Sequence, residues 1–324
     1  MAPLFTIAVT TYNRKEMLRE CLASILQQEF SDYEVLVGNN FTEEVLTLES
    51  LEISDSRVNI VNHQSDLGHQ GNANYLLAKA RGRYFTWLAD DDMLTPQCLI
   101  AINSALEQHA YPKCVFSSYI DAPEYMPETP INADHLSRLI NGAEFVQQYL
   151  SRKLKLIGCY GGFETSYLRG VGGMRKLGTR FSPYADNLIA IEAGLLDRVA
   201  YVNEPLFFFR THDQSLSFTS SDLTAYASAQ VELLSICEEI FMNARLVKDY
   251  HRNLYQLLAW FTGDIYSVSG RSRNLWSAGM FNHLRVLERY ARRTGWFYPK
   301  FVALNFWLAA NSVRNRVFQK REAA

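Results

Sequence analysis

Three consecutive carboxylates, Asp90, Asp91 and Asp92, follow directly after an apolar run that is typical of a buried strand. Oxygen ligands one residue apart suit Mg2+ or Mn2+, and these ions stay partly hydrated, so phosphate oxygens can complete their shell. The pattern predicts a metal site for phosphate chemistry, with Asp90 and Asp92 as ligands. The alternative is a solvated acidic loop before a helix, because Thr95-Pro96 is typical of a helix start.

The segments around the aspartates alternate between strand and helix patterns. We expect strands over Phe5–Thr10, Glu34–Gly38, Val58–Asn62 and Tyr84–Ala89. One helix, Lys15–Gln28, is expected between the first two strands, and another, Asn72–Arg81, between the last two. This order predicts an α/β fold with a mostly parallel, doubly wound sheet. Such sheets bind ligands beyond the carboxyl ends of their strands, which is where the aspartates would lie.

The next part of the chain is irregular before it returns to regular patterns. Asp121 to His135 contains three prolines and predicts a surface loop. Gly158 to Met174 carries six glycines, which indicate either a close approach of backbone to a ligand or a tight connection between elements. A helix from about Asp186 to Leu196 and a strand over Val199–Arg210 follow. We therefore predict a catalytic domain over residues 1–218.

Residues 219–324 predict a helical C-terminal region whose last part is strongly basic. Its basic residues between positions 285 and 321 are Arg285, Arg289, Arg292, Arg293, Lys300, Arg314, Arg316, Lys320 and Arg321. Only Glu288 opposes them, and tryptophan, tyrosine and phenylalanine are interleaved. Basic residues with aromatics suit an anionic membrane surface. The alternative is an amphipathic helix that packs on the core or on a second subunit of a homo-oligomer.

The composition is that of an ordinary globular protein of 324 residues with a formal net charge of −2. Such a charge gives no overall attraction to nucleic acid, and we predict no nucleic-acid partner. The five cysteines are scattered and predict neither a disulfide framework nor a zinc site. No secretion signal or membrane-spanning run is evident, so the expected location is cytoplasmic, with peripheral attachment at the inner face of the membrane as a further expectation.

Several short motifs occur in one order along the first two thirds of the chain. They are Thr10 to Arg14, Val35 to Thr42, the set Gly68, Asn74 and Gly82, and Asp91 to Pro96. Together they resemble a family 2 glycosyltransferase of the GT-A fold. The resemblance implies a Rossmann-like, mostly parallel central sheet flanked by helices, to which the C-terminal helices are an appendage.

The resemblance also implies an activity. It is inverting transfer of a sugar from a nucleoside diphosphate sugar, with UDP or dTDP favoured, to a hydroxyl of a glycan acceptor. A lipid-linked saccharide in cell-surface polysaccharide biosynthesis is the acceptor that the family suggests. The residues that it assigns to the nucleotide sugar are Thr10, Tyr12, Arg14, Asn39, Asn74, Asp90, Asp91 and Arg210.

Two later motifs supply the chemistry. Tyr184-Ala185-Asp186 resembles the Glu-Asp pair of the family, which makes Asp186 the expected catalytic base for the acceptor hydroxyl. Arg210 and His212 resemble an Arg-x-His motif, so His212 is expected to bind the metal or the phosphates. Mn2+ or Mg2+ on Asp90 and Asp92 would offset the charge of the leaving diphosphate. Without the resemblance, Asp186 would be a helix cap and His212 a core histidine.

The chain also departs from the family pattern. Asn39 stands where an aspartate is frequent, although its carbonyl can still accept a hydrogen bond from uracil or thymine. Ala73 and Ala185 replace an arginine and a glutamate. These changes leave open a non-catalytic sugar-nucleotide-binding or scaffold protein. A dehydrogenase or nucleotidylyltransferase is disfavoured, because residues 1–20 contain no glycine for a phosphate loop.

Overall fold

The computed structural model describes residues 2–122, 136–212, 215, 220–271 and 277–322, and it forms two compact units. The first unit comprises Met1–Phe145, Arg152–Lys176 and Ala185–His212, and the second comprises Val146–Ser151, Leu177–Tyr184 and Asp213–Ala324. The predicted boundary at Phe218 lies outside the described residues, as does most of the predicted loop after Asp121.

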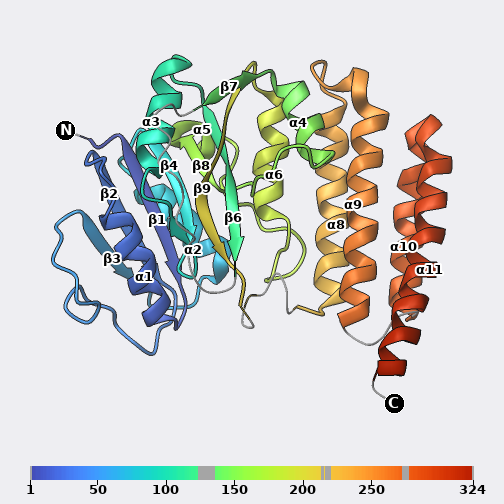
Figure 1. The fold of residues 1–324 in the computed structure, drawn as a ribbon, viewed down its shortest axis with the longest axis horizontal. Helices are drawn as coiled ribbons and strands as arrows, with labels where there is room; N and C mark the ends of the chain where they lie inside the picture. The colour runs from blue at the N-terminus through green and yellow to red at the C-terminus, as the bar shows by residue number, and fades with distance from the viewer. Residues whose placement is uncertain (1, 123–135, 213–214, 216–219, 272–276, 323–324) are drawn as a thin grey trace. The chain divides into compact units, whose positions relative to one another are not determined.

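A mixed sheet of nine strands forms the centre of the first unit (Figure 1). Its strands are β1 (Phe5–Thr11), β2 (Tyr33–Asn39), β3 (Val58–Asn62), β4 (Tyr84–Ala89), β5 (Met93–Leu94), β6 (Cys114–Ala122), β7 (Ser137–Ile140), β8 (Gly161–Glu164) and β9 (Val199–Arg210). The order is β3-β2-β1-β4-β8-β6-β9-β5, and β7 pairs with β9.

The parallel part of the sheet confirms the predicted βαβ pattern. β1 pairs in parallel with β2 and β4, and β2 pairs in parallel with β3. In this register Thr10 lies opposite both Gly38 and Ala89, so the carboxyl ends of the three strands meet at one edge. β8 is antiparallel to both its neighbours, and β6 pairs in parallel with β9.

The α-helices of the described residues are α1 (Lys15–Leu26), α2 (Gly68–Lys79), α3 (Cys98–Gln108), α4 (Gly142–Leu150), α5 (Thr165–Gly170), α6 (Ala185–Glu192), α8 (Leu223–Phe241), α9 (Tyr250–Arg271), α10 (Ala278–Ala291) and α11 (Tyr298–Glu322). The same residues form the short 3-10 helices η1 (Ala193–Leu195), η2 (Val247–Asp249) and η3 (Arg292–Phe297). The predicted first helix thus ends two residues early, and the second begins at Gly68 rather than at Asn72.

The sheet of the first unit is covered on both faces. α1 buries Leu18, Cys21, Leu22 and Ile25 in one core cluster with α3 and with the odd-numbered residues of β1 and β2. α2 covers the opposite face, because a Cβ on Gly38, which alternates with Val37 along β2, would meet Asn72 and Leu76 of that helix. This arrangement leaves the carboxyl edge of the parallel strands for loops.

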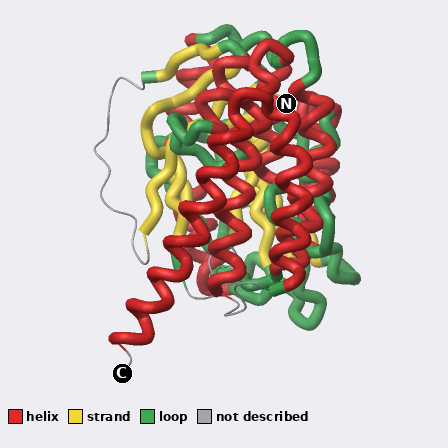
Figure 2. Tube along the Cα trace, turned by 90° about the vertical axis from the view of Figure 1, so that its right-hand side faces the viewer, coloured by secondary structure: helices red, strands yellow, loops and turns green. Residues whose placement is uncertain are grey.

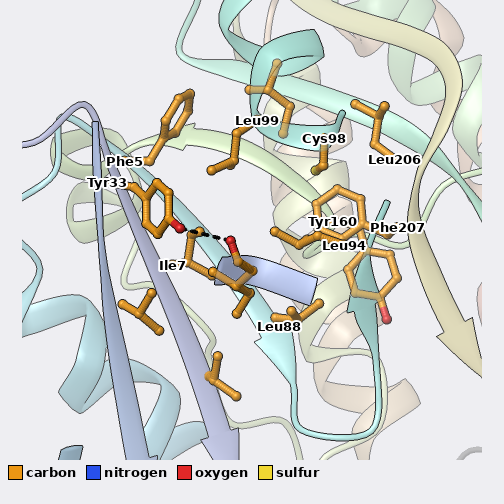
Figure 3. Close-up of a cluster of buried hydrophobic side chains, with 14 of the residues drawn as sticks. Phe5, Ile7, Tyr33, Leu88, Leu94, Cys98, Leu99, Tyr160, Leu206 and Phe207 are labelled. Carbon is orange, nitrogen blue, oxygen red and sulfur yellow. Dashed lines mark hydrogen bonds between the residues drawn. The ribbon is translucent and has the colours of Figure 1, made fainter. Parts of the chain in front are cut away.

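The core cluster reaches that edge through one aromatic pair (Figure 3). The rings of Tyr160 and Phe207 are stacked, with centroids 4.6 Å apart and an interplanar angle of 6°. At the other end of the cluster, the Tyr33 hydroxyl donates to the carbonyl oxygen of Ile25 at 2.9 Å. Stacking fixes the plane of the Tyr160 ring and so helps to hold its hydroxyl in contact with Asp92.

The second unit is mainly the helices α8 to α11, which confirms the predicted helical region. α8, α10 and α11 each contact α9, and Figure 2 shows α11 running to the C-terminus as one continuous helix. Within the described parts of the chain, we find no helix with the length and apolar character needed to cross a bilayer.

Candidate functional site

The three aspartates lie where β4 ends, beside the end of β1. The Asp90 backbone amide donates to the Thr10 carbonyl oxygen at 3.2 Å, and the Thr11 hydroxyl donates to Asp90 Oδ2 at 2.6 Å. Asn13 has a φ of 54°, a left-handed conformation that turns the chain just before Arg14. The Arg14 guanidinium then bridges Asp90 and Asp91, at 2.6 Å from Asp91 Oδ2.

Asp92 faces away from Arg14 and into the protein. Its Oδ2 accepts a hydrogen bond from the Tyr160 hydroxyl, and its Oδ1 accepts one from the Arg210 backbone amide at 3.0 Å. Each oxygen therefore already has one protein donor. The predicted metal ligands Asp90 and Asp92 both lie at this edge, but they are held by different partners.

Burial makes the negative charge of this cluster unfavourable. It raises the pKa of Asp90 to about 6, although Arg14 and the Thr11 hydroxyl act in the opposite direction. Burial and the neighbouring Asp91 raise the pKa of Asp92 well above its ordinary range. A cation at the cluster would therefore stabilise the ionised carboxylates.

Asp91 is the point where Arg14 and His212 already converge. His212 Nε2 lies 3.0 Å from Asp91 Oδ2, the same oxygen that Arg14 contacts. Over the described residues, no three histidine, cysteine, aspartate or glutamate side chains are arranged to hold a metal ion. Arg14 instead supplies a positive charge directly to Asp90 and Asp91.

The Arg210 side chain points to a different partner. Its guanidinium donates to Glu20 Oε2 at 2.5 Å and lies 3.8 Å from the Met93 sulfur. Only the Arg210 backbone contacts the aspartate cluster, through Asp92. Of the predicted Arg-x-His motif, the structure therefore brings the His212 side chain, and not the Arg210 side chain, to the carboxylates.

Aromatic and amide side chains lie beside the aspartates at the ends of β1 and β2. Tyr12 is 52% exposed, and its ring meets the Phe41 ring edge to face at 5.4 Å. Asn39 Nδ2 donates to the Glu44 carbonyl oxygen at 2.7 Å and to Asn62 Oδ1 at 2.8 Å. Its Oδ1 accepts from the Phe41 amide at 3.1 Å, which leaves that oxygen with a second acceptor position.

This corner contains a small recess. It is lined by Thr11, Asn13, Arg14, Lys15, Asn39, Phe41, Glu44 and Leu46. Asn74, in contrast, holds a turn in place, because its side chain donates to the Met174 carbonyl at 3.0 Å and accepts from the Met174 amide at 2.8 Å. Asn74 is thus engaged with the protein backbone.

Asp186 lies in the first turn of α6, partly buried. Burial raises the pKa of its carboxyl, while hydrogen bonds from the backbone amides of Asp186, Gly158 and Asn187 act to lower it. A Cβ on Gly158 would overlap the carbonyl oxygen of Asp186, so this position requires glycine. The predicted glycine-rich segment is therefore a tight connection, and its first glycine fits against the expected base.

One short segment links Asp186 to the aspartate cluster. The charges of both Asp186 and Asp92 help to raise the pKa of Cys159, after burial as the main cause. Gly158 donates to Asp186 and Tyr160 donates to Asp92. Residues 158–160 thus bring two carboxylates, 94 positions apart in the sequence, to one region of the first unit.

Sequence analysis missed three residues of this site. Thr11 and Tyr160 hydrogen-bond Asp90 and Asp92, and His69, at the start of α2, lies within the electrostatic influence of Asp91 and Arg14. Thr11 lies inside the motif Thr10 to Arg14, so the sequence contained a signal for it. No local sequence pattern indicated His69 or Tyr160.

Residues 6–163 match the family model described as Glycosyl transferase family 2. The matched segment is 158 of the 324 residues, a little under half of the chain, and it is similar to glycosyl transferase family 2. The match confirms the resemblance drawn from the motifs between Thr10 and Pro96.

Two relatives with named activities match part of the chain. It is 29% identical over 119 residues to the GalNAc(5)-diNAcBac-PP-undecaprenol beta-1,3-glucosyltransferase of Campylobacter jejuni, a match that covers 35% of this chain and 38% of that protein. It is 29% identical over 90 residues to the UDP-Glc:alpha-D-GlcNAc-diphosphoundecaprenol beta-1,3-glucosyltransferase WfgD of Escherichia coli, covering 28% of this chain and 36% of that protein. The chain therefore spans less than two fifths of the length of these relatives.

A solved structure matches over more of the chain. TarS 1-349 of S. aureus, solved in complex with UDP-GlcNAc, superimposes with a TM-score of 0.54 over 91% of each chain, at 13% sequence identity. At this identity the likeness concerns the fold alone. It confirms the predicted GT-A fold class with a C-terminal helical region.

Proposed function

We propose that this protein transfers a sugar, with inversion, from a nucleoside diphosphate sugar to a hydroxyl of a lipid-linked saccharide in cell-surface polysaccharide synthesis. The observation that carries the proposal is the cluster of buried carboxylates beside an exposed aromatic ring, with Asp186 linked to the cluster through residues 158–160. The ring and the carboxylate cluster suit a nucleotide sugar, and Asp186 suits the deprotonation of a hydroxyl nucleophile.

A divalent cation, Mn2+ or Mg2+, fits the chemistry of the cluster. The donor set combines carboxylate oxygens with one imidazole, and Asp91 and His212 already converge. Asp90 and Asp92 are the further predicted ligands, and the raised pKa of Asp90 favours a positive partner. Arg14 would release Asp91 when the cation binds and would then be available to a phosphate. The cation would offset the charge of the leaving diphosphate.

The nucleotide base is proposed to lie against Tyr12, in the recess that Asn39 and Phe41 line. Both Asn39 amide hydrogens are engaged with protein oxygens, so this side chain can only accept a further hydrogen bond. Uracil and thymine present an N–H donor at the position where cytosine presents an acceptor. UDP and dTDP donors are therefore favoured over cytidine donors.

Asp186 is proposed as the base that takes the proton of the acceptor hydroxyl. Burial raises the pKa of its carboxyl, which makes it a better proton acceptor than an exposed aspartate, while hydrogen bonds from backbone amides act to lower that pKa. A base opposite the leaving group gives attack from the opposite face of the sugar and hence inversion. The two relatives are named for acceptors that carry a diphosphate-linked undecaprenol, which supports a lipid-linked acceptor here.

The test is a thermal-shift panel of UDP-, dTDP- and GDP-sugars, each with and without Mn2+. A ligand that binds only the folded state adds about 2.7 kcal/mol of stability at 100 times its Kd. We expect one uridine or thymidine donor to stabilise the protein, and to do so more strongly with Mn2+. Failure of every donor under both conditions would remove the proposal.

A second arm separates the enzyme from the non-catalytic alternative. A stabilising donor is incubated with a short lipid-linked saccharide acceptor, and release of the nucleoside diphosphate is measured. Binding together with release supports transfer. Binding without release, across a panel of acceptors, would favour the non-catalytic sugar-nucleotide-binding protein.

A further inference from the structure

The charge of the chain is unevenly distributed. Residues 285–321 contain nine lysines and arginines and one acidic residue, Glu288, which gives this segment a formal charge of +8. Because the whole chain carries −2, the remaining residues carry −10. Such a separation of charge indicates a partner of opposite sign for the basic segment.

Helix α10 carries part of this charge on one face. Its buried side chains are Met280, His283, Leu287 and Ala291. Phe281, Arg285, Arg289 and Arg292 recur at intervals of three or four residues on the opposite side, and all four are exposed. The three arginines line one open hollow along the helix, together with Asn282, Val286 and Glu288.

Ion pairs neutralise only some of these cations. Arg292 pairs with Glu288 at 2.9 Å, and Arg293 pairs with Glu238 at 2.7 Å. In the described structure neither Arg285 nor Arg289 has an acidic partner. Two adjacent guanidinium groups in one hollow therefore face solvent without a counter-ion from the protein.

Large aromatic side chains are exposed on the same segment. Trp296 is 95% exposed beside Gly295, whose φ of 57° interrupts the helical path between α10 and α11. On α11, Phe306 and Trp307 are 74% and 62% exposed. Exposed tryptophans beside arginines suit the boundary between lipid headgroups and acyl chains, because the ring has an apolar body and a polar N–H.

We propose that the segment from Phe281 to Trp307 docks on an anionic lipid bilayer. Arg285 and Arg289 would contact lipid phosphates, while Trp296 and Trp307 would insert at the headgroup level. A symmetric pairing of two copies through this face is disfavoured, because it would bring the same unpaired arginines together. The proposal stands on charge and exposure, and it does not depend on sugar transfer.

The test is co-sedimentation of the full chain with vesicles. One set is phosphatidylcholine alone, and the other is an equal mixture of phosphatidylcholine and phosphatidylglycerol. We expect binding to the anionic vesicles only, weakening as salt is added. The double variant Arg285→Glu, Arg289→Glu should lower the partition coefficient by about tenfold or more.

Further variants separate insertion from charge. Trp296→Ala with Trp307→Ala should reduce partitioning several-fold and remove a blue shift of tryptophan fluorescence on anionic vesicles. The matched controls are Lys248→Glu and Met242→Ala, which make the same kinds of change at exposed positions of η2 and at the end of α8. They should bind like the wild type.

Three outcomes would overturn the proposal. They are equal binding to both vesicle types, no binding to either, and loss of binding in the controls to the same extent as in the double variant. A wild-type dimer in analytical ultracentrifugation that the double variant converts to monomer, without vesicle binding, would assign the surface to a second copy instead. Circular-dichroism melts of each variant exclude unfolding as the cause of lost binding.

Discussion

Each unit of the molecule contains a buried polar cluster, and the two clusters are built differently. At the sheet edge of the first unit, the three carboxylates of Asp90, Asp91 and Asp92 lie close together, with Arg14 and His212 in contact with them. In the helical unit, Tyr184, Gln230, Asp264 and His283 form a chain of single hydrogen bonds (2.7–2.8 Å).

The helical cluster matches each donor to an acceptor. The Tyr184 hydroxyl donates to Asp264, Gln230 donates to the Tyr184 oxygen, and His283 Nε2 lies 2.7 Å from Gln230 Oε1. Because an amide oxygen only accepts, His283 carries its proton on Nε2. Burial lowers the pKa of His283 to about 4, so the ring is neutral.

The difference separates a site for chemistry from a site for stability. The first cluster has more negative charge than its neighbours offset, and burial makes that charge costly, so it favours an incoming cation. The second is a matched network that contributes to the stability of the helices. Changes at the sheet edge of the first unit should mainly alter activity, and changes in the helical cluster should mainly alter stability.

The largest expected effect is that of Asp186→Asn. Loss of the general base should lower kcat by about 10²- to 10⁴-fold, with donor binding and melting temperature nearly unchanged. Steady-state kinetics and donor titration measure the two quantities. Asp197→Asn is the matched control at an exposed carboxylate beyond η1. A variant with wild-type turnover would return Asp186 to the role of a helix cap.

The helical cluster should make stability depend on pH. The folded protein keeps His283 neutral down to about pH 4, whereas the unfolded chain protonates it near pH 6.5. Unfolding therefore takes up a proton between these values, and the free energy of unfolding should fall by about 3 kcal/mol as the pH falls from 6.5 to 4. Denaturant melts of wild type and His283→Gln, compared across this range, isolate the contribution. Parallel curves would show that His283 is not the responsible group.

Asn39→Asp should destabilise the protein, even though aspartate is frequent at this position in the family. The new carboxylate cannot donate, and it would face the Glu44 carbonyl and Asn62 Oδ1 without a hydrogen. We expect a loss of about 2 kcal/mol in the free energy of unfolding. Urea melts test this, with Asn59→Asp on the exposed side of β3 as the control. An unchanged midpoint would mean that the fold does not need the two hydrogen bonds that the Asn39 amide donates.

The smallest effect is expected for Tyr184→Phe. It removes the hydroxyl that joins Gln230 to Asp264 and should cost about 1–2 kcal/mol of stability. Tyr255→Phe, on the same group of helices, removes a hydroxyl for which the described structure gives no hydrogen bond. If Tyr184→Phe left stability intact but reduced kcat, the division between the two clusters would fail.

Much of the fold could be predicted because its signals are local. β1 to β4 appear as apolar runs, and α1 buries residues at helical spacing. β8 could not be found, because Gly-Gly-Phe-Glu has too few side chains to show alternation. Its place between β4 and β6 depends on pairing with strands distant in the sequence.

The candidate site shows the same division. Residue type and order alone pointed to Asp90, Asp91 and Asp92, since three carboxylates directly after a buried strand are unusual. Asp186 and His212 were predicted only through the family resemblance. The contacts that these residues make could not be predicted from residue type and order. Arg14 bridges two aspartates, and the Arg210 side chain contacts Glu20. Both contacts depend on how the ends of separate strands meet in space.

The sequence by itself determined the fold class, the family and the identity of the acidic residues, because periodicity and motif order are properties of neighbouring positions. Only the tertiary structure decided which donors hold each carboxylate, which of Asn39's hydrogens are already engaged, and that Tyr160 and Gly158 link Asp92 to Asp186. The reason is physical, since hydrogen bonds and burial act over a few ångströms in space and join residues that lie up to 190 positions apart.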